Sequence, residues 1–466
     1  MTLRLGFFSV IRPVFKGDSQ GAAQRTLQHL RALGESWGFE VFAASLAATD
    51  VETAQRVAQE LKAQKLDLLL IQHTTFATGD LLAPLLHAAS RVGLWALPES
   101  SGRGGASGPL PLNALCGLNM TLSFLDHPEV AKKGPVKWFY GEVDDPFFKE
   151  RLEPTLAALR GLRAVETARI LQIGGTAPAF YGIEELPALD SVVVERRELE
   201  DLFERVAAVP ASEAQALARD WGQQETLEAP AEHLERAARI ELGLRALAAE
   251  VDADALAVRC WPELPERCGA MACASLGRLG DTEIPAACEG DVMGALSMLA
   301  LQGVSGQPTI LMDLSDVDLQ DDTVQVWHCG NAPLQWATRT NGEPNTRLTT
   351  HFNRDGVGVV RDMILRPGAA TAFRLLSGGR RAVIASGAFT GPGKASFDGV
   401  RGWLGELVWN RTPLDAAAFL ANVLESRIPH HFAFGSGDLT APLSELCAWL
   451  GAVPLPARAA TMNLSP

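Results

Sequence analysis

The N-terminal third of the chain alternates short apolar segments with segments of helical spacing. Residues 3–10 are apolar and strand-like, residues 21–33 have helical spacing, and residues 40–44 return to a strand pattern. A helix at 51–63 and a strand at 66–72 continue the same order. Because a helix that links two neighbouring strands lets them pair in parallel, this alternation predicts a Rossmann-like α/β layer.

A second alternating stretch follows, and then the pattern changes. Residues 135–140 and 168–173 are strand-like around a helix at 146–159. A Gly-Gly-Thr-Ala-Pro turn at 174–178 comes directly after a strand, where α/β proteins commonly meet their ligands. Beyond residue 305 short β-rich runs are broken by glycine and proline, which predicts a mostly β region.

We therefore expect an α/β protein with two Rossmann-like α/β domains followed by a β-rich C-terminal domain. The expected boundaries are residues 1–108, 109–304 and 305–466. The Gly/Ser-rich segment at 100–111 lacks the spacing of dinucleotide-binding and P-loop motifs, so it predicts a domain-crossing or active-site loop rather than a nucleotide site.

Composition and charge narrow the class of protein. The 466 residues are 47% hydrophobic, which is enough to fill the cores of more than one domain. A net charge of −14 with no cluster of Lys and Arg argues against a nucleic-acid partner. The first residues lack an export signal, and no apolar run reaches the ~18 residues that a membrane span needs. We expect a cytoplasmic protein with no membrane partner.

The seven cysteines never occur as C-x-x-C, and their number is odd. That pattern is typical of reduced thiols rather than of a disulfide framework. Cys260, Cys268 and Cys273 lie close in sequence and could form a thiolate metal site, but buried free cysteine is the more common outcome.

Two carboxylates and a late histidine pair form the clearest candidate site. Glu289 precedes an apolar helix, Asp313 follows a Gly-Gln-Pro turn and a short apolar strand, and His430-His431 come much later. The helix and strand can fold the first two side chains back to one point. Two carboxylates and one imidazole suit Mn²⁺ or a similar ion, whereas structural zinc sites more often use thiolates. The alternative is an acidic helix cap and a turn residue without further purpose.

The same segments resemble the L-fucose isomerase branch of the fucose/arabinose isomerase superfamily. The likeness rests on Ile11-Arg12-Pro13, on the segment from Glu289 to Asp313 with its Glu-x-Asp opening, and on His430-His431. It implies two Rossmann-like domains before a β-rich domain that carries the last metal ligand. It also implies that Glu289, Asp313 and His431 bind Mn²⁺, or another divalent cation such as Mg²⁺ or Co²⁺.

The resemblance implies a metal-dependent aldose–ketose isomerase that acts on a hexose or pentose through a cis-enediolate intermediate. Glu289 and Asp313 would be catalytic, and one of them would move the proton between neighbouring carbons. The sequence does not assign which. Arg12, His328 and His430 would contact the sugar, with His328 also a candidate for a further metal ligand. If Arg12 reaches a neighbouring subunit, as the resemblance implies, the protein should be a homo-oligomer, a trimer or hexamer.

Substrate identity stays open, since the chain is shorter than typical L-fucose isomerases and has only two tyrosines. It is also similar to superfamily members that isomerise sulfoquinovose, a sulfonated hexose. An anion pocket for that sugar could use four arginines, or these could be solvated surface charges: Arg259, Arg361, Arg380 and Arg381. The alternative from another class is a sugar-binding or regulatory module without turnover. His73, at the end of an apolar strand, could contact a ligand or be a hydrogen-bonded loop histidine.

Overall fold

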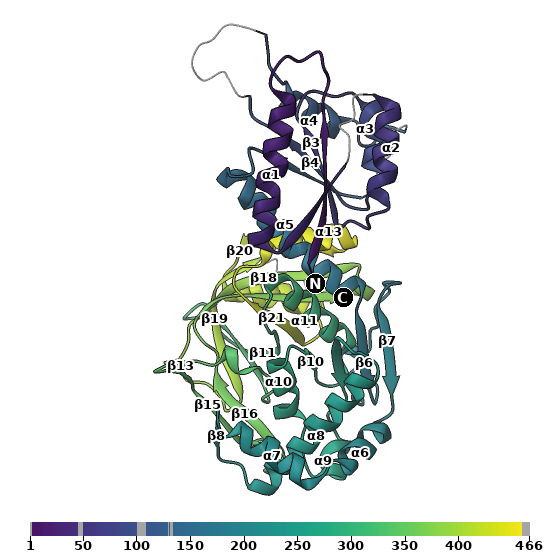
Figure 1. The fold of residues 1–466 in the computed structure, drawn as a ribbon. Coiled ribbons are helices and arrows are strands. Elements are labelled where there is room, and N and C mark those ends of the chain that lie inside the picture. Colours follow the sequence, from purple (N-terminus) through teal and green to yellow (C-terminus); the bar gives the residue numbers. More distant parts are fainter. Residues whose placement is uncertain (1, 45–49, 100–108, 129, 131–133, 459–466) are drawn as a thin grey trace. The chain divides into compact units, whose positions relative to one another are not determined.

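The computed structural model describes residues 2–44, 50–99, 109–128, 130 and 134–458. Most of the predicted glycine-rich loop, residues 100–108, lies outside the described residues. The chain divides into two compact units, Met1–Leu159 and Arg160–Pro466 (Figure 1). The domain boundaries expected from the sequence at 108/109 and 304/305 stay predictions.

The first unit is built on a parallel sheet with the strand order β2-β1-β3-β4-β5 (Figure 1). Its strands are β1 (Leu3–Val10), β2 (Phe39–Ala43), β3 (Leu68–His73), β4 (Val92–Ala96) and β5 (Val136–Tyr140). Its helices are α1 (Ser19–Trp37), α2 (Val51–Lys62), α3 (Gly79–Leu86) and α4 (Ala114–Ser123), and α5 (Pro146–Glu166) runs across the boundary between the units. β3 and β4 are wholly buried, as expected of strands whose sheet is covered on both faces. The predicted N-terminal α/β layer is confirmed.

One strand belongs to a different sheet from the one that the sequence suggested. The sequence grouped residues 135–140 with the second alternating stretch, but β5 pairs in parallel with β4, with Val92 opposite Val136. The local pattern identifies a strand correctly but carries no information about its partner, which is chosen by packing across the whole sheet. Trp95 of β4 stacks on Phe148 of α5, with ring centroids 4.3 Å apart. The helix that follows β5 in the chain therefore also packs on the first sheet.

The second unit begins with another parallel sheet, of order β10-β9-β6-β7. Its strands are β6 (Arg169–Ile173), β7 (Val193–Arg197), β9 (Ala255–Val258) and β10 (Ala286–Ala287). The helices of this region are α6 (Leu199–Ala208), α7 (Ala211–Trp221), α8 (Ala231–Glu250), α9 (Glu263–Cys268), α10 (Cys273–Asp281) and α11 (Val292–Ser305), with the 3-10 turn η1 (Tyr181–Ile183). Among the described helices, none is both long and apolar enough to cross a membrane.

The β-rich region expected beyond residue 305 is a closed barrel with extensions. Around the barrel the strands follow the order β11-β12-β19-β18-β17-β21, and β21 pairs with β11 again. The barrel strands are β11 (Ile310–Asp318), β12 (Thr323–His328), β17 (Gly368–Leu376), β18 (Arg381–Phe389), β19 (Val400–Trp409) and β21 (His431–Ser436). Phe389 and Phe434 meet in the barrel's core with ring centroids 5.8 Å apart. The protein is thus mixed α/β with a β-rich C-terminal region, while the number of Rossmann-like domains stays a prediction.

Shorter elements surround the barrel. Its sheet is extended by β8 (Thr226–Leu227), β15 (Thr346–Thr350), β16 (Val359–Ile364), β20 (Thr412–Pro413) and β22 (Val453–Pro454), while β13 (Arg339–Thr340) and β14 (Glu343–Pro344) pair in a separate two-stranded sheet. The remaining helices are α12 (Ala416–Glu425) and α13 (Thr440–Leu450), with the 3-10 turns η2 (Leu334–Trp336) and η3 (Ser377–Gly379).

The predicted helix and strand between the two candidate carboxylates are confirmed as α11 and β11, with two corrections. Asp291, not Glu289, is the N-cap of α11, since its carboxylate accepts the N–H of Gly294 at 2.7 Å. Asp313 lies inside β11 rather than at its end, because the strand continues to Asp318 through an irregularity between Leu314 and Asp316. Gly306 ends α11 in the left-handed conformation at φ +65°.

Candidate active site

The first candidate carboxylate stands on a tight turn at the carboxyl ends of the parallel strands. Glu289 follows β10 with φ +61°, a left-handed conformation that is rare for residues with a side chain. Its carbonyl accepts the N–H of Ala177, at 2.8 Å, from the turn after β6. A Cβ on Gly290 would lie 2.0 Å from the Gly175 carbonyl oxygen, so only glycine fits there. The turn after β6 and the turn after β10 therefore pack tightly against each other and hold Glu289 in place.

The barrel supplies the other two predicted metal ligands. Asp313 on β11 and His431 on β21 are direct partners in the antiparallel register. His431 Nε2 lies 3.7 Å from Asp313 Oδ1 and 3.6 Å from Glu289 Oε2. The structure therefore brings together the three residues that the sequence nominated as ligands.

Asp291 and Arg374 orient the histidine. His431 is wholly buried, and its Nδ1 lies 2.9 Å from Asp291 Oδ2. Because an ionised carboxylate can only accept, His431 Nδ1 donates its proton to Asp291, and Nε2 faces Glu289 and Asp313. Arg374 holds Asp291 from the other side through two hydrogen bonds, of 2.5 and 3.0 Å. The sequence showed Asp291 only as part of an acidic helix start, and no sequence signal marked Arg374.

The charges around the site keep Glu289 and Asp291 ionised. Burial raises the pKa of Asp291, but the Arg374 charge and the contact with His431 outweigh it and hold the pKa well below its usual range. Burial likewise raises the pKa of Glu289, and the hydrogen bond from His430 with the charges of nearby histidines brings its net value below the ordinary one. Both groups therefore carry negative charge near neutral pH.

The donors fit a divalent cation. Asp313 Oδ1 is buried and has no hydrogen-bond partner among the described residues, an arrangement that costs free energy unless another group satisfies the oxygen. Glu289, His430 and His431 also place one potential ligand atom each within 4.8 Å of one another. Carboxylate oxygens with an imidazole nitrogen suit Mn²⁺ and similar ions. The roles of these ligands stay predictions.

The two further histidines lie beside His431, with ring centroids 4.1 Å away for His430 and 5.7 Å away for His328. His430 Nε2 is 3.0 Å from Glu289 Oε2, and 41% of its side chain is exposed, so this ring can also face a bound molecule. His328 is buried, and its Nδ1 accepts the N–H of Cys329 at 2.8 Å, which places the ring proton on Nε2. His328 Nε2 is thus a donor rather than a metal ligand in this arrangement.

Cys288 is a site residue that the sequence analysis did not select. Its Sγ lies 3.0 Å from His328 Nε2 and 3.7 Å from His431 Nε2. Burial raises the pKa of this thiol far above its ordinary value, so the sulfur stays protonated. Its position directly before Glu289 was the available signal, but a single buried cysteine is too common to single out.

An aromatic row leads away from the carboxylates. Phe180 makes edge contacts with His430 and with Trp261, both at 5.6 Å between ring centroids. The guanidinium of Arg354 lies over Trp261, 5.0 Å from the ring centroid. The aromatic row therefore runs from His430 through Phe180 and Trp261 to the guanidinium of Arg354.

The arginines proposed for an anion pocket have other roles where their contacts are described. Arg361 is wholly buried and paired with Glu225 and Asp281, so it is neither free to bind substrate nor a surface charge. Arg259 pairs with Glu263 and donates to the Gly174 carbonyl. Arg361 was therefore a wrong candidate, because a lone arginine in a sequence does not show whether it is neutralised in the core.

Arg12 and His73 belong to the first unit. Arg12 lies two residues after the end of β1, and its backbone N–H donates to Thr75 Oγ1 at 2.7 Å. The position just after the strand is confirmed, and the sugar contact stays a prediction. His73 is wholly buried and its Nε2 lies 3.2 Å from Thr121 Oγ1. This histidine is a hydrogen-bonded core residue in the first unit.

Three relatives found by comparison with known proteins are all named sulfoquinovose isomerase. No protein-family model matches the chain. A sulfoquinovose isomerase of Priestia aryabhattai is 27% identical over 415 residues, which cover 87% of this chain and 89% of the relative. One from Alkalicoccus urumqiensis is 30% identical over 326 residues, 66% of this chain and 69% of the relative. One from Clostridium sp. (strain MSTE9) is 27% identical over 394 residues, 82% of this chain and 84% of the relative.

Proposed function

Because this chain belongs to the family of sugar isomerases that includes those sulfoquinovose isomerases, and is therefore an aldose–ketose isomerase, we propose that it isomerises sulfoquinovose with the help of a divalent cation. The non-catalytic alternative is set aside by this membership. The L-fucose isomerase branch named from the sequence stays a prediction, and sulfoquinovose becomes the first substrate to test.

The orientation of His431 carries the proposal of a metal-dependent reaction. Asp291 fixes the ring so that Nε2 turns to Glu289 and Asp313, which is the usual arrangement of a histidine that binds a metal. A divalent cation between Glu289 and Asp313 would offset the repulsion between their two carboxylates. The buried, unpartnered Asp313 Oδ1 supports the same conclusion.

The chain's own residues can then be given roles. A divalent ion on Glu289, Asp313 and His431 would stabilise negative charge that develops on two neighbouring sugar oxygens. Glu289 or Asp313 takes the proton from C2 of the aldose and returns it to C1 to give the ketose. Glu289 receives a hydrogen bond from the half-exposed His430, and His328 offers a proton-bearing Nε2 toward the same centre.

The sulfonate end of the substrate is assigned to Arg354. Among the described residues this guanidinium contacts no carboxylate, and it lies over Trp261 at one end of the aromatic row that reaches His430 and Glu289. Aromatic faces suit the apolar faces of a sugar ring, and an arginine suits a sulfonate through charge-assisted hydrogen bonds. Arg361 is excluded from this role by its buried pairing with Glu225.

A substrate panel tests the proposal. Purified protein with Mn²⁺ is given sulfoquinovose, glucose, L-fucose, D-arabinose and L-rhamnose, and ketose formation is followed by NMR in D₂O. We expect sulfoquinovose to be converted with the highest kcat/KM and to take up solvent deuterium, and Glu289→Gln to be inactive in the same assay. Faster conversion of a neutral sugar would reject the sulfonated substrate, and no conversion of any sugar would reject the whole proposal.

A further inference from the structure

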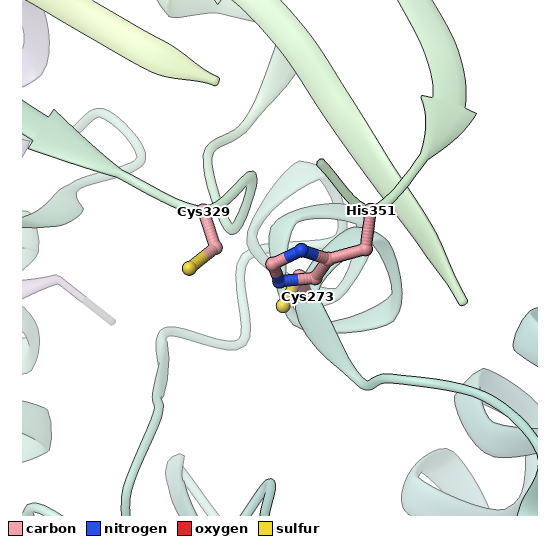
Figure 2. Close-up of side chains that lie close together, drawn as sticks. All are labelled: Cys273, Cys329 and His351. Atoms are coloured by element: carbon pink, nitrogen blue, oxygen red, sulfur yellow. The ribbon is translucent and has the colours of Figure 1, made fainter. Parts of the chain in front are cut away.

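Three side chains from distant parts of the second unit meet beside the barrel. Cys273 is the first residue of α10, Cys329 follows β12, and His351 follows β15. One potential ligand atom from each lies within 4.8 Å of the others. Figure 2 shows the two thiols and the imidazole facing a common space. Cys260 and Cys268, which lie near Cys273 in sequence, are not part of this group.

The surroundings of this group are apolar, and one of its atoms lacks a partner. Cys273 is 5% exposed and His351 is 1% exposed. Met271, Val360, Trp261, Phe352 and Cys273 itself belong to the same small core cluster, against which Cys329 packs. His351 Nε2 is buried with no hydrogen-bond partner in the described part of the chain, whereas its Nδ1 accepts the N–H of Asn353 at 3.1 Å. Leaving a buried nitrogen unsatisfied costs free energy, so a partner for it is expected.

We propose that Cys273, Cys329 and His351 form a binding site for a thiophilic divalent ion, with Zn²⁺ the best match. Two sulfurs and one nitrogen are ligands that Zn²⁺ prefers, at about 2.3 Å to sulfur and 2.0–2.1 Å to nitrogen. The set is softer than the oxygen-rich ligands Glu289 and Asp313, so the two sites select different ions.

Binding requires defined proton movements. Each thiol gives up its proton to solvent as its sulfur becomes a ligand. The ring proton of His351 moves from Nε2 to Nδ1, and the Asn353 N–H turns away from Nδ1. Asn353, Arg354 and Asp355 form an exposed turn, so this backbone can rotate without opening the core.

The site would join three elements and support the isomerase centre indirectly. The Cys329 N–H donates to His328 Nδ1 and so sets which nitrogen of His328 carries a proton. An ion on the Cys329 sulfur would hold that N–H in place. The ion is thus given a structural and positioning role, with no contact to substrate.

Cobalt substitution tests the site by spectroscopy. The purified protein is reduced, stripped with a chelator under anaerobic conditions and titrated with Co²⁺. We expect a thiolate-to-cobalt charge-transfer band in the near ultraviolet that Zn²⁺ abolishes. Cys273→Ser and His351→Gln should each lose the band, while Cys288→Ser, which alters the other thiol–histidine group, and Cys447→Ser, a buried thiol outside the site, should keep it.

A measurement on the wild-type protein guards against variants that fail to fold. Zn²⁺ should protect Cys273 and Cys329, but not Cys268, from alkylation, as read by mass spectrometry of peptides. The proposal is overturned if no thiolate band forms, or if the band survives Cys273→Ser and disappears in Cys288→Ser. A Cys273–Cys329 disulfide in the protein as purified, together with no bound ion after reduction and anaerobic loading, would also overturn it and assign the pair to redox chemistry instead.

Discussion

Asp313 on β11 and His431 on β21 are opposite each other in one antiparallel ladder, and His431 Nε2 lies 3.7 Å from Asp313 Oδ1. Their backbone positions are fixed by the pairing of the two strands, and the neighbouring pair Met312 and Phe432 is buried in the barrel. Two of the three candidate metal ligands are therefore held by sheet structure rather than by a loop. Only Glu289 depends on a turn.

Metal removal and loss of either carboxylate should stop the reaction. Chelator treatment should abolish aldose–ketose conversion, and Mn²⁺ should restore it better than Ca²⁺, whose looser coordination orients the sugar oxygens less well. Glu289→Gln and Asp313→Asn should each lower kcat by at least about 10²-fold, the lower range for an acid–base group. Asp316→Asn, on the same strand as Asp313, is the control and should keep full activity when ketose formation is followed by NMR in D₂O.

Replacing Asp291 should weaken metal binding without removing a ligand. Asp291→Asn keeps an oxygen to cap α11 but no longer accepts a charge-assisted hydrogen bond from His431 Nδ1. We expect the affinity for Mn²⁺ to fall by about 10- to 100-fold, measured by calorimetry. Asp415→Asn, which changes the matching N-cap of α12, controls for the cap and should bind Mn²⁺ as the wild type does. Equal affinities for all three proteins would contradict the orienting role.

Arg354 should discriminate between charged and neutral sugars. Arg354→Ala should raise KM for sulfoquinovose by about 10- to 100-fold, since a hydrogen bond to a charged group contributes about 1.5–3 kcal/mol. The kcat for sulfoquinovose and the turnover of neutral sugars should both change by less than about 10-fold. Arg381→Ala alters a cation at the exposed start of β18 and serves as the control. An unchanged KM in Arg354→Ala would remove this residue from the sulfonate site.

Arg12 should act in the active site of a neighbouring subunit. The segment carries an exposed apolar side chain, Val14 at 67%, next to the predicted sugar contact, which favours burial against another copy. We expect light scattering to show a closed trimer or hexamer. Arg12→Ala and Glu289→Gln should be nearly inactive alone, and co-refolding them should regain activity through mixed sites. A fully active monomer, or no regain in verified mixed oligomers, would contradict this assembly.

His73 should make the first unit less stable in mild acid. Burial lowers its pKa from 6.5 to about 4, because the core disfavours the charged imidazolium. As the pH falls below 6.5 the unfolded chain binds this proton before the folded one, so stability is lost progressively down to the folded pKa near 4. From the 2.5-unit difference, the total loss is about 3 kcal/mol. Hydrogen exchange of β3 at pH 7 and pH 5 measures the part of this loss that falls between those two pH values.

The matched variants for that measurement are His73→Gln and His29→Gln. His73→Gln should exchange with a smaller pH dependence than the wild type, since no group titrates at that position. His29 is exposed on α1, so its replacement should leave the pH dependence of β3 intact. A wild-type protein whose β3 protection is the same at both pH values would show that His73 does not control this stability.

The sequence by itself determined the kinds of elements and nominated the candidate site residues. Continuous apolar runs locate α11 and β11, because hydrophobicity is a local property of the chain. The residue types at Glu289, Asp313 and His431 predict oxygen and nitrogen ligands, and that role stays a prediction. The N-terminal parallel layer followed from alternation alone.

The tertiary structure alone decided which distant residues meet. Nothing local in the sequence pairs Asp313 with His431, places Arg374 against Asp291, or gathers Cys273, Cys329 and His351. Strand partners and register depend on packing across a sheet, so β5 could be recognised as a strand and still be assigned to the wrong sheet. The same limit applied to Arg361, whose charge is visible in the sequence but whose neutralisation by Glu225 exists only once the chain has folded.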